Sequence, residues 1–212
     1  MTTSALTRMD AEKEFDRQRA VLHDLLVAEG QSADVLDELN AVREATIDQV
    51  TGALVPESAR VPFALVLTRE VLPVSLAVPH LRLGKQEGFL SADTADIDTF
   101  SPIEQVGIPE RPVYAVIDID RGAATRNWTP DEAMAQFAKD NRSPLTVEEG
   151  TAFLLHYPKS LEKNNCFQMP GSRCGDRRVP GLWISNRKPK LGFCWAGNRH
   201  TWLGIASCAT RI

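Results

Sequence analysis

Residues 113–120 read Val-Tyr-Ala-Val-Ile-Asp-Ile-Asp, and the turn residues Arg121 and Gly122 follow them. The first five of these residues form a continuous apolar run, which is typical of a buried strand. The two turn residues mark the point at which the strand ends. This stretch therefore predicts a strand in a small mixed or antiparallel sheet.

Two helix-start signals follow this strand. Thr129 is a favourable N-cap, Pro130 suits the first helical position, and Glu132 completes a capping box. These residues predict a helix from about residue 130 to residue 141. The sequence Thr-Val-Glu-Glu at residues 146–149 repeats the capping box and predicts a second helix, which ends before Pro158.

The chain before the strand predicts two helices and further strands. Residues 10–29 have amphipathic spacing, Gly30 suits a C-cap, and Ser32 suits the N-cap of a second helix with apolar residues three or four positions apart. Together these segments predict a helical hairpin. Residues 62–68 predict a β-strand, and residues 73–83 predict another that is interrupted at Pro79.

The pattern changes after Pro158. Glycine and proline separate short apolar runs at residues 181–185, 191–196 and 201–206, which predicts a small antiparallel β arrangement. The expected fold class is α+β. We expect a single domain over residues 1–212, with three parts: a helical hairpin (1–56), an α/β body (57–158) and a basic lobe rich in cysteine and tryptophan (159–212).

The composition is that of a globular protein, but its charge is unevenly distributed. The 212 residues are 43% hydrophobic and 25% charged, with a net charge of −4. Residues 159–212 carry 10 Lys and Arg against 2 Asp and Glu, whereas residues 1–158 carry 14 against 26. The basic lobe therefore favours an anionic partner, although it could also neutralise the acidic body internally.

The N-terminal residues lack the apolar core of a secretory signal. The longest apolar stretches are broken by prolines and fall short of the ~20 residues that a membrane-spanning helix needs. We expect a cytoplasmic protein without a membrane segment, whose cysteines are reduced thiols.

Residues 166–212 contain all four cysteines and three of the four tryptophans. Arg173, Arg177 and Arg178 lie in a glycine-bounded loop, where guanidinium groups and backbone amides suit phosphate or carboxylate. We therefore predict a pocket for a small anionic ligand. Its predicted ligand-binding residues are Arg173, Arg177, Arg178, Trp195, Asn198 and His200. Alternatively, Asp176 and the acidic body could occupy the arginines as ion pairs.

Two other functions use the cysteines. Cys174, flanked by arginines, could be the nucleophile of a cysteine-dependent enzyme with His156 or His200 as the base. A zinc-stapled interaction domain would use thiolates from the set Cys166, Cys174, Cys194 and Cys208. The long spacing between these cysteines, without a Cys-x-x-Cys pair, argues against zinc.

The overall pI of about 5.6 and the absence of a known motif disfavour nucleic acid as a partner. No sequence feature indicates a cofactor or an oligomeric state.

Three motifs in the lobe carry a family resemblance: Asn-Cys-Phe at residues 165–167, Gly-Ser-Arg-Cys-Gly-Asp-Arg-Arg-Val-Pro at 171–180, and Cys-Trp-Ala-Gly-Asn-x-His-Thr-Trp-Leu-Gly at 194–204. With these motifs the chain resembles an uncharacterised actinobacterial family of unknown function. The resemblance covers the C-terminal third well and the middle loosely. It implies no activity, so the choice among binding, catalysis and zinc depends on the residues themselves.

Overall fold

The computed structural model describes residues 5–54 and 59–212. Its helices and the strands of its two larger sheets confirm the α+β class, with N-terminal helices and a strand-rich C-terminal part. The helices are α1 (Arg8–Ala28), α2 (Asn40–Val50), α3 (Val74–Ala77), α4 (Pro130–Lys139) and α5 (Val147–His156). Among the described residues, no helix has the length and apolar character needed to cross a membrane.

The first sheet is built around the strand predicted at residues 113–120. It has the order β1-β6-β13-β7, and β14 pairs with β6 beyond the end of β13. Its strands are β1 (Arg60–Leu67), β6 (Val113–Asp120), β7 (Ser143–Pro144), β13 (Ser207–Cys208) and β14 (Thr210–Arg211). β1 and β6 are antiparallel, with Leu65 opposite Ala115. The predicted strand is therefore confirmed at the centre of this sheet.

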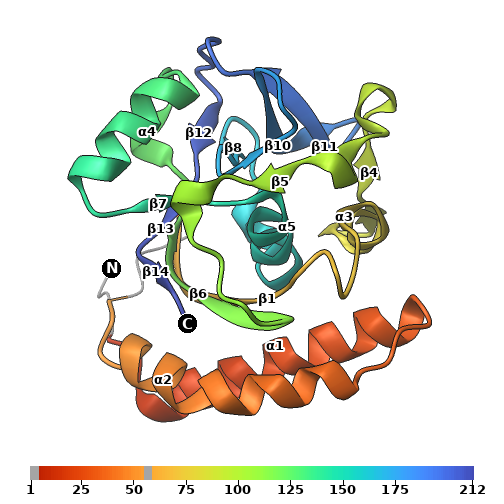
Figure 1. Ribbon diagram of the computed structural model, residues 1–212, viewed down its shortest axis with the longest axis vertical. Helices are drawn as coiled ribbons and strands as arrows, with labels where there is room; N and C mark the ends of the chain where they lie inside the picture. Colours follow the sequence, from red (N-terminus) through yellow and green to blue (C-terminus); the bar gives the residue numbers. More distant parts are fainter. Residues whose placement is uncertain (1–4, 55–58) are drawn as a thin grey trace.

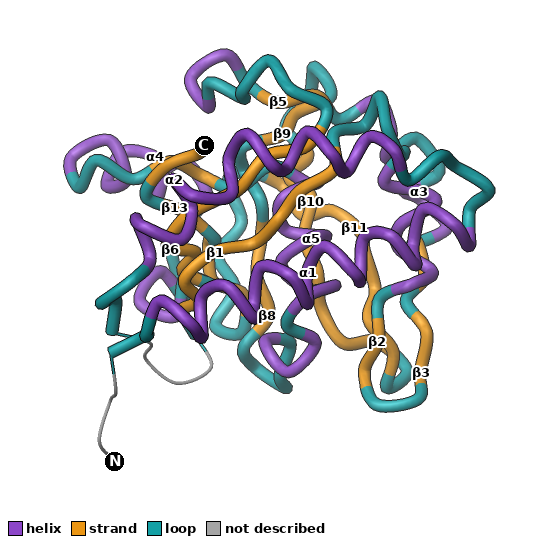
Figure 2. Tube along the Cα trace, turned by 90° about the horizontal axis from the view of Figure 1, so that it is seen from below, coloured by secondary structure: helices purple, strands orange, loops and turns teal. Residues whose placement is uncertain are grey.

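Both faces of the first sheet are covered. Phe63 and Ala115 belong to a core formed with α1 and α2, whereas Ala64 and Tyr114 belong to the main core, which includes α5. Neighbouring residues belong to different cores because successive side chains of a strand point to opposite faces of the sheet. Figure 1 shows the helical hairpin below β1 and β6 and α5 above them, and Figure 2 shows α1 and α2 running across these strands.

The second sheet has the order β12-β8-β10-β11-β4 and lies on the other side of α5 (Figure 1). Its strands are β4 (Phe89–Leu90), β8 (Cys166–Gln168), β10 (Arg178–Ser185), β11 (Lys188–Trp195) and β12 (Leu203–Ile205). Two short pairs complete the strands: β2 (Arg82–Leu83) with β3 (Gln86–Glu87), and β5 (Ser101–Pro102) with β9 (Ser172–Arg173).

α5 joins the two sheets through the main core. The ring of Phe153 on α5 lies 5.4 Å, centroid to centroid, from the ring of Phe167 on β8. Both predicted capping boxes are present, with Thr129 and Glu132 at the start of α4 and Thr146 and Glu149 at the start of α5. The capping signals therefore predicted the helix that occupies the centre of the fold.

One expectation about local structure was wrong. Residues 73–83 form α3 and a 3₁₀ turn before the two-residue strand β2, instead of an interrupted strand. A short apolar run does not distinguish a strand from a buried helix, and the prolines at 73 and 79 lie where a helical turn tolerates them. The second helix of the hairpin begins with a 3₁₀ segment, Asp34–Leu39, before α2.

Side chains cover the edge strand β1. The carboxamide of Gln18 on α1 accepts a hydrogen bond from Leu65 N–H at 2.8 Å and donates to the Phe63 carbonyl at 3.2 Å. The Tyr157 hydroxyl also donates to the Phe63 carbonyl, and His156 Nε2 lies 2.8 Å from the Leu65 carbonyl oxygen. These side chains take the place of a further strand, because they bond the Phe63 carbonyl and both backbone groups of Leu65.

The buried His156 predicts a loss of stability at acid pH. Its Nε2 must carry a proton to bond the Leu65 carbonyl, and its Nδ1 is buried without a hydrogen-bond partner among the described residues. Burial lowers the pKa of His156 from 6.5 to about 4. The unfolded chain therefore binds a proton in the window between pH 6.5 and 4, whereas the folded chain does not, so acid favours unfolding there.

We expect His156 to account for a loss of about 3 kcal/mol in the free energy of unfolding as the pH falls from 6.5 to 4. His156→Gln should flatten this part of the pH profile, because the amide can still donate to the Leu65 carbonyl and does not titrate. Urea unfolding of both proteins across this range measures the difference. Parallel pH profiles for the two proteins would contradict the buried neutral imidazole.

Candidate functional site

Arg178 is occupied by the protein's own carboxylates. Its guanidinium donates to both oxygens of Asp96, at 3.1 and 2.7 Å, and its Nε donates to Asp176 at 2.8 Å. The same group lies over the rings of Phe100 and Phe193. The hydrogen bonds to Asp96 and Asp176 raise the pKa of Arg178. This side chain therefore connects the basic lobe to the acidic body, which is the alternative role considered for it.

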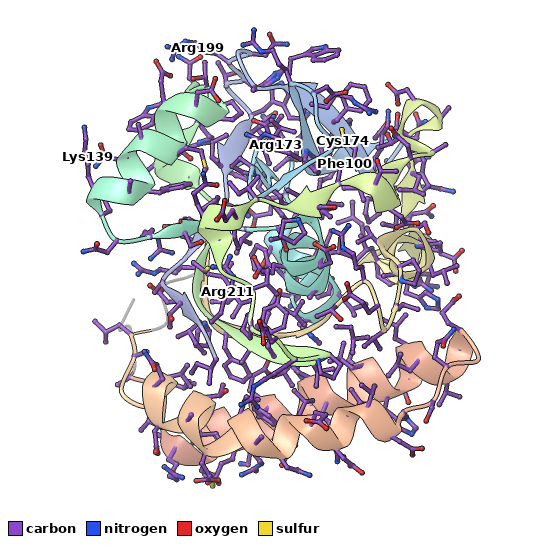
Figure 3. The ribbon with its side chains drawn as sticks, viewed as in Figure 1. Phe100, Lys139, Arg173, Cys174, Arg199 and Arg211 are labelled. Atoms are coloured by element: carbon purple, nitrogen blue, oxygen red, sulfur yellow. The ribbon has the colours of Figure 1, made fainter. Side chains whose placement is uncertain are left out.

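The two neighbouring arginines differ from Arg178. Arg173 Nη1 donates to the backbone carbonyls of Pro170 and Ser172, and burial lowers its pKa. Arg177 is exposed, and neither arginine makes an ion pair within the described part of the chain. Figure 3 shows Arg173, Cys174 and Phe100 in the region of the second sheet, while Arg199 lies at the outer end of the lobe. The three loop arginines thus differ in their surroundings: Arg178 pairs with carboxylates, Arg173 donates to backbone carbonyls and Arg177 is exposed.

The surroundings of Cys174 oppose the formation of a thiolate. Its Sγ lies 3.2 Å from Asp176 Oδ1, and desolvation together with this carboxylate raises the pKa of Cys174. The ring centroids of His200 and Trp202 are 5.4 Å apart, and His200 Nε2 is buried without a hydrogen-bond partner in the described part of the chain. Among the described residues, no hydrogen bond joins Cys174 to His200 or His156. A nucleophilic cysteine needs the opposite electrostatic environment.

The four thiols do not form a metal site. Cys166, Cys174, Cys194 and Cys208 are all free, and over residues 5–54 and 59–212 no three His, Cys, Asp or Glu side chains are placed to hold a metal ion. Burial raises the pKa of Cys194 to about 11 and that of Cys208 to about 12. Protonated, separated thiols do not support the zinc alternative.

Trp195 and Asn198 lie at the surface of the lobe. The Trp195 side chain is among the exposed large apolar groups, and its ring makes an edge contact with Phe193. The backbone N–H of Asn198 bonds the Trp195 carbonyl, which makes a turn beyond β11. Both residues therefore occupy a solvated surface.

The lobe instead contains a cleft of about 440 Å³ on the face of the second sheet that points away from α5. Its walls come from the segment before β8, from the β10–β11 hairpin and from the residue before β12. The lining residues are Lys163, Asn164, Cys166, Trp183, Ile184, Asn186, Arg187 and Trp202. We call this the tryptophan cleft. Its volume lies in the range of small-molecule sites.

The register of the hairpin places one tryptophan in this cleft. Leu182 and Leu191 face the main core, so the next pair along, Trp183 and Lys190, faces outward. The Trp183 ring lies over Gly192, where a Cβ would come within 2.4 Å of it, and Lys190 Nζ lies 5.3 Å from its centroid. Gly192 therefore leaves room for the indole ring to lie against the sheet.

The second tryptophan is held against the first. The rings of Trp183 and Trp202 make an edge-to-face contact, with centroids 6.3 Å apart and planes at 76°. His200 also makes an edge contact with Trp202. These contacts fix both indoles before any ligand arrives, and such fixed aromatic faces suit a planar group.

The rim of the tryptophan cleft is basic. Lys163 and Arg187 are exposed, neither makes an ion pair within the described part of the chain, and no carboxylate belongs to the lining. Asn186 and Arg187 form the two-residue turn of the β10–β11 hairpin, with φ of 52° and 62°. This is the turn type that twists with the strands, and a bulky residue is uncommon at such φ.

The clustering of tryptophans and positive charge predicted the lobe, but not these residues of the cleft. Asn186 and Arg187 stand between the two predicted runs at 181–185 and 191–196. Interpreting them as a hairpin turn would have placed Trp183 opposite Lys190. The strand register set by that turn would also have placed the Trp183 and Lys190 side chains on the same face of the sheet.

No curated protein and no solved structure matches the chain significantly. A family described only as a family of unknown function, DUF5701, matches residues 21–212. The match covers both larger sheets, α5 and most of the helical hairpin. The prediction of an uncharacterised family is confirmed, and the chain belongs to the family of unknown function DUF5701.

Proposed function

We propose that the protein binds a small planar anion, an aromatic ring that carries a carboxylate or a phosphate, in the tryptophan cleft. The observation that carries this proposal is the pairing of two fixed indole rings with two cations that have no ion-pair partner in the described chain. The planar part of the ligand stacks on an indole face. Its charged group lies at the rim between Lys163 and Arg187.

The electrostatics of the cleft support an anion. Two other arginines of the structure are neutralised, Arg178 by Asp96 and Arg211 by Glu149. Lys163 and Arg187 are not neutralised in this way, and the lining offers them no carboxylate. A ligand anion can therefore approach without displacing an internal ion pair.

The cysteine in the cleft supports binding in preference to covalent chemistry. Cys166 lines the cleft, and burial raises the pKa of its thiol. A protonated, largely buried thiol packs as a small apolar group. Cys166 thus supplies apolar contact for the ligand at the base of the cleft.

Thermal-shift and calorimetric titration with adenosine 5′-monophosphate and 2-naphthoate test the proposal, with adenosine and inorganic phosphate as controls. We expect the two aromatic anions to raise the melting temperature more than either control does, because only they combine a flat ring with a negative charge. Absence of stabilisation by both aromatic anions would contradict the proposal.

Charge reversal in the cleft gives the site-specific prediction. A hydrogen bond to a charged group contributes about 1.5–3 kcal/mol, so Lys163→Glu and Arg187→Glu should each weaken binding by about 10-fold or more. Arg177→Glu is the matched control, because Arg177 is exposed, lies in the same lobe, and does not line the cleft. Loss of binding in Arg177→Glu alone would place the ligand in the glycine-bounded loop instead.

A further inference from the structure

A second cleft, of about 450 Å³, lies beside the first turn of α5 and is separate from the tryptophan cleft. Its walls come from the end of β1, from the segment around β5 and from α5. The side chains that matter for binding are Thr68, Arg69, Ile103, Ile108, Tyr114 and Glu148. We call it the Glu148 cleft.

Glu148 is a buried carboxylate, and only one of its two oxygens has a hydrogen-bond partner among the described residues. Its side chain is 6% exposed, and its Oε1 accepts a hydrogen bond from Arg69 Nη2. Its Oε2 is buried and has no hydrogen-bond partner among the described residues, and the same is true of Thr68 Oγ1. Thr68 and Glu148 both line this cleft, and buried polar atoms are almost always paired, so these two oxygens suit a ligand that donates hydrogen bonds.

Two donors that line the cleft, Arg69 and Tyr114, do not supply these hydrogen bonds. Arg69 Nη2 is shared between Glu148 Oε1 and the Phe100 carbonyl, which fixes the guanidinium in place. The Tyr114 hydroxyl donates to Glu149 Oε1 at 3.0 Å. Both donors are therefore committed to other acceptors.

The charge of the cleft favours a cation. Glu70, Glu104 and Glu148 line it, and Arg69 is the one cation among its described lining residues. Desolvation raises the pKa of Glu148, although the neighbouring Arg69 acts in the opposite direction. The described residues provide no trio of ligands for a metal ion, whereas Ile103 and Ile108 offer apolar contact.

We propose that the Glu148 cleft binds a small organic ammonium ion, whose N–H groups donate to Glu148 Oε2 and Thr68 Oγ1 while its carbon chain contacts Ile103 and Ile108. The ammonium pairs the two oxygens that the protein leaves unpaired. The apolar contact distinguishes an organic cation from an inorganic one. This site is independent of the anion proposed for the tryptophan cleft.

Saturation-transfer NMR on the full chain tests the inference with n-butylammonium as the probe. n-Butanol and butyrate are the neutral and anionic controls of matched size. A ligand of so few atoms is expected to bind with a Kd of about 1 mM, which suits this method. Saturation transfer to n-butylammonium that exceeds the transfer to both controls supports the proposal. Equal transfer to all three compounds, or none to the ammonium ion, overturns it.

Two variants assign the binding to this cleft. Glu148→Gln retains an oxygen for Arg69 but removes the negative charge, and Thr68→Val removes one acceptor without altering the ion pair. We expect Glu148→Gln to weaken n-butylammonium binding by about 10-fold or more and Thr68→Val by a smaller factor. Glu38→Gln, at an exposed position in the helical hairpin, is the control. Unchanged affinity in both cleft variants overturns the assignment, and Thr68→Val decides it alone if Glu148→Gln does not fold.

Discussion

Replacing Arg211 with methionine is expected to lower the free energy of unfolding by about 3–5 kcal/mol. Arg211 lies in the last strand, and its side chain is 4% exposed while that of Glu149 is fully buried. Arg211 Nε and Nη2 donate to the two oxygens of Glu149 at 2.5 and 2.8 Å. Without Arg211, the Glu149 carboxylate would be left buried and unpaired, or would have to take up a proton.

Glu149 connects several elements, which increases the expected effect. It accepts hydrogen bonds from the Tyr114 hydroxyl on β6 and from the Thr146 N–H at the start of α5. Burial and the nearby Glu149 carboxylate raise the pKa of Tyr114 well above its usual value. Arg211 also donates to the Pro144 carbonyl of β7. Loss of this residue therefore disturbs the first sheet and the central helix together.

Urea unfolding measures the effect, and Arg199→Met is the matched control. Arg199 forms an ion pair with Glu132, but both side chains are about half exposed, so its loss should change stability by less than about 1 kcal/mol. Figure 3 shows the contrast between Arg199 at the surface and Arg211 in the interior. The double variant Glu149→Gln/Arg211→Met should recover part of the loss, because no charge remains buried. Equal destabilisation by Arg211→Met and Arg199→Met would contradict this interpretation.

Gly204→Ala is expected to destabilise the protein by about 3 kcal/mol or more, because two backbone segments meet there without room for a methyl group. A Cβ on Gly204 would lie 2.2 Å from the Gly122 carbonyl oxygen and 2.9 Å from that of Arg121. Neither oxygen can move without shifting the chain after β6. Because β12 follows Trp202 directly, the variant should also displace this ring and weaken ligand binding in the tryptophan cleft.

Gly197→Ala is the control for Gly204→Ala. A Cβ there would meet only the end of the flexible Arg177 side chain, at 3.1 Å. We expect a change of less than about 0.5 kcal/mol, measured by the same urea titration. Equal stability of the two alanine variants would contradict the close contact between Gly204 and Gly122.

Local signals in the sequence were sufficient to predict the elements at the centre of the fold. These signals are the capping boxes at Thr129 and Thr146 and the apolar run of β6. Each signal lies within a few consecutive residues and does not depend on distant parts of the chain. Residues 73–83 lack such a signal, because prolines and a short apolar run suit either a helical turn or a strand. The prediction failed there for that reason.

The site was harder to predict because ion pairing depends on distant residues. Arg178 and Asp96 are 82 positions apart, and nothing near either residue indicates that they meet. Lys163 and Arg187 have no such partner in the described chain, and the sequence alone does not indicate that these two cations are unpaired. The excess of positive charge located the lobe, but only the fold distinguishes neutralised cations from available ones.

Two-dimensional NMR of the four tryptophan indole N–H groups during titration with adenosine 5′-monophosphate tests the proposed function most directly. Trp183 and Trp202 line the cleft, whereas Trp128 packs near α4 and Trp195 lies on the outer surface. We predict that the signals of Trp183 and Trp202 shift with a common saturation curve while those of Trp128 and Trp195 stay in place. A shift confined to Trp195, or no shift in any of the four signals, would contradict the anion site in the tryptophan cleft.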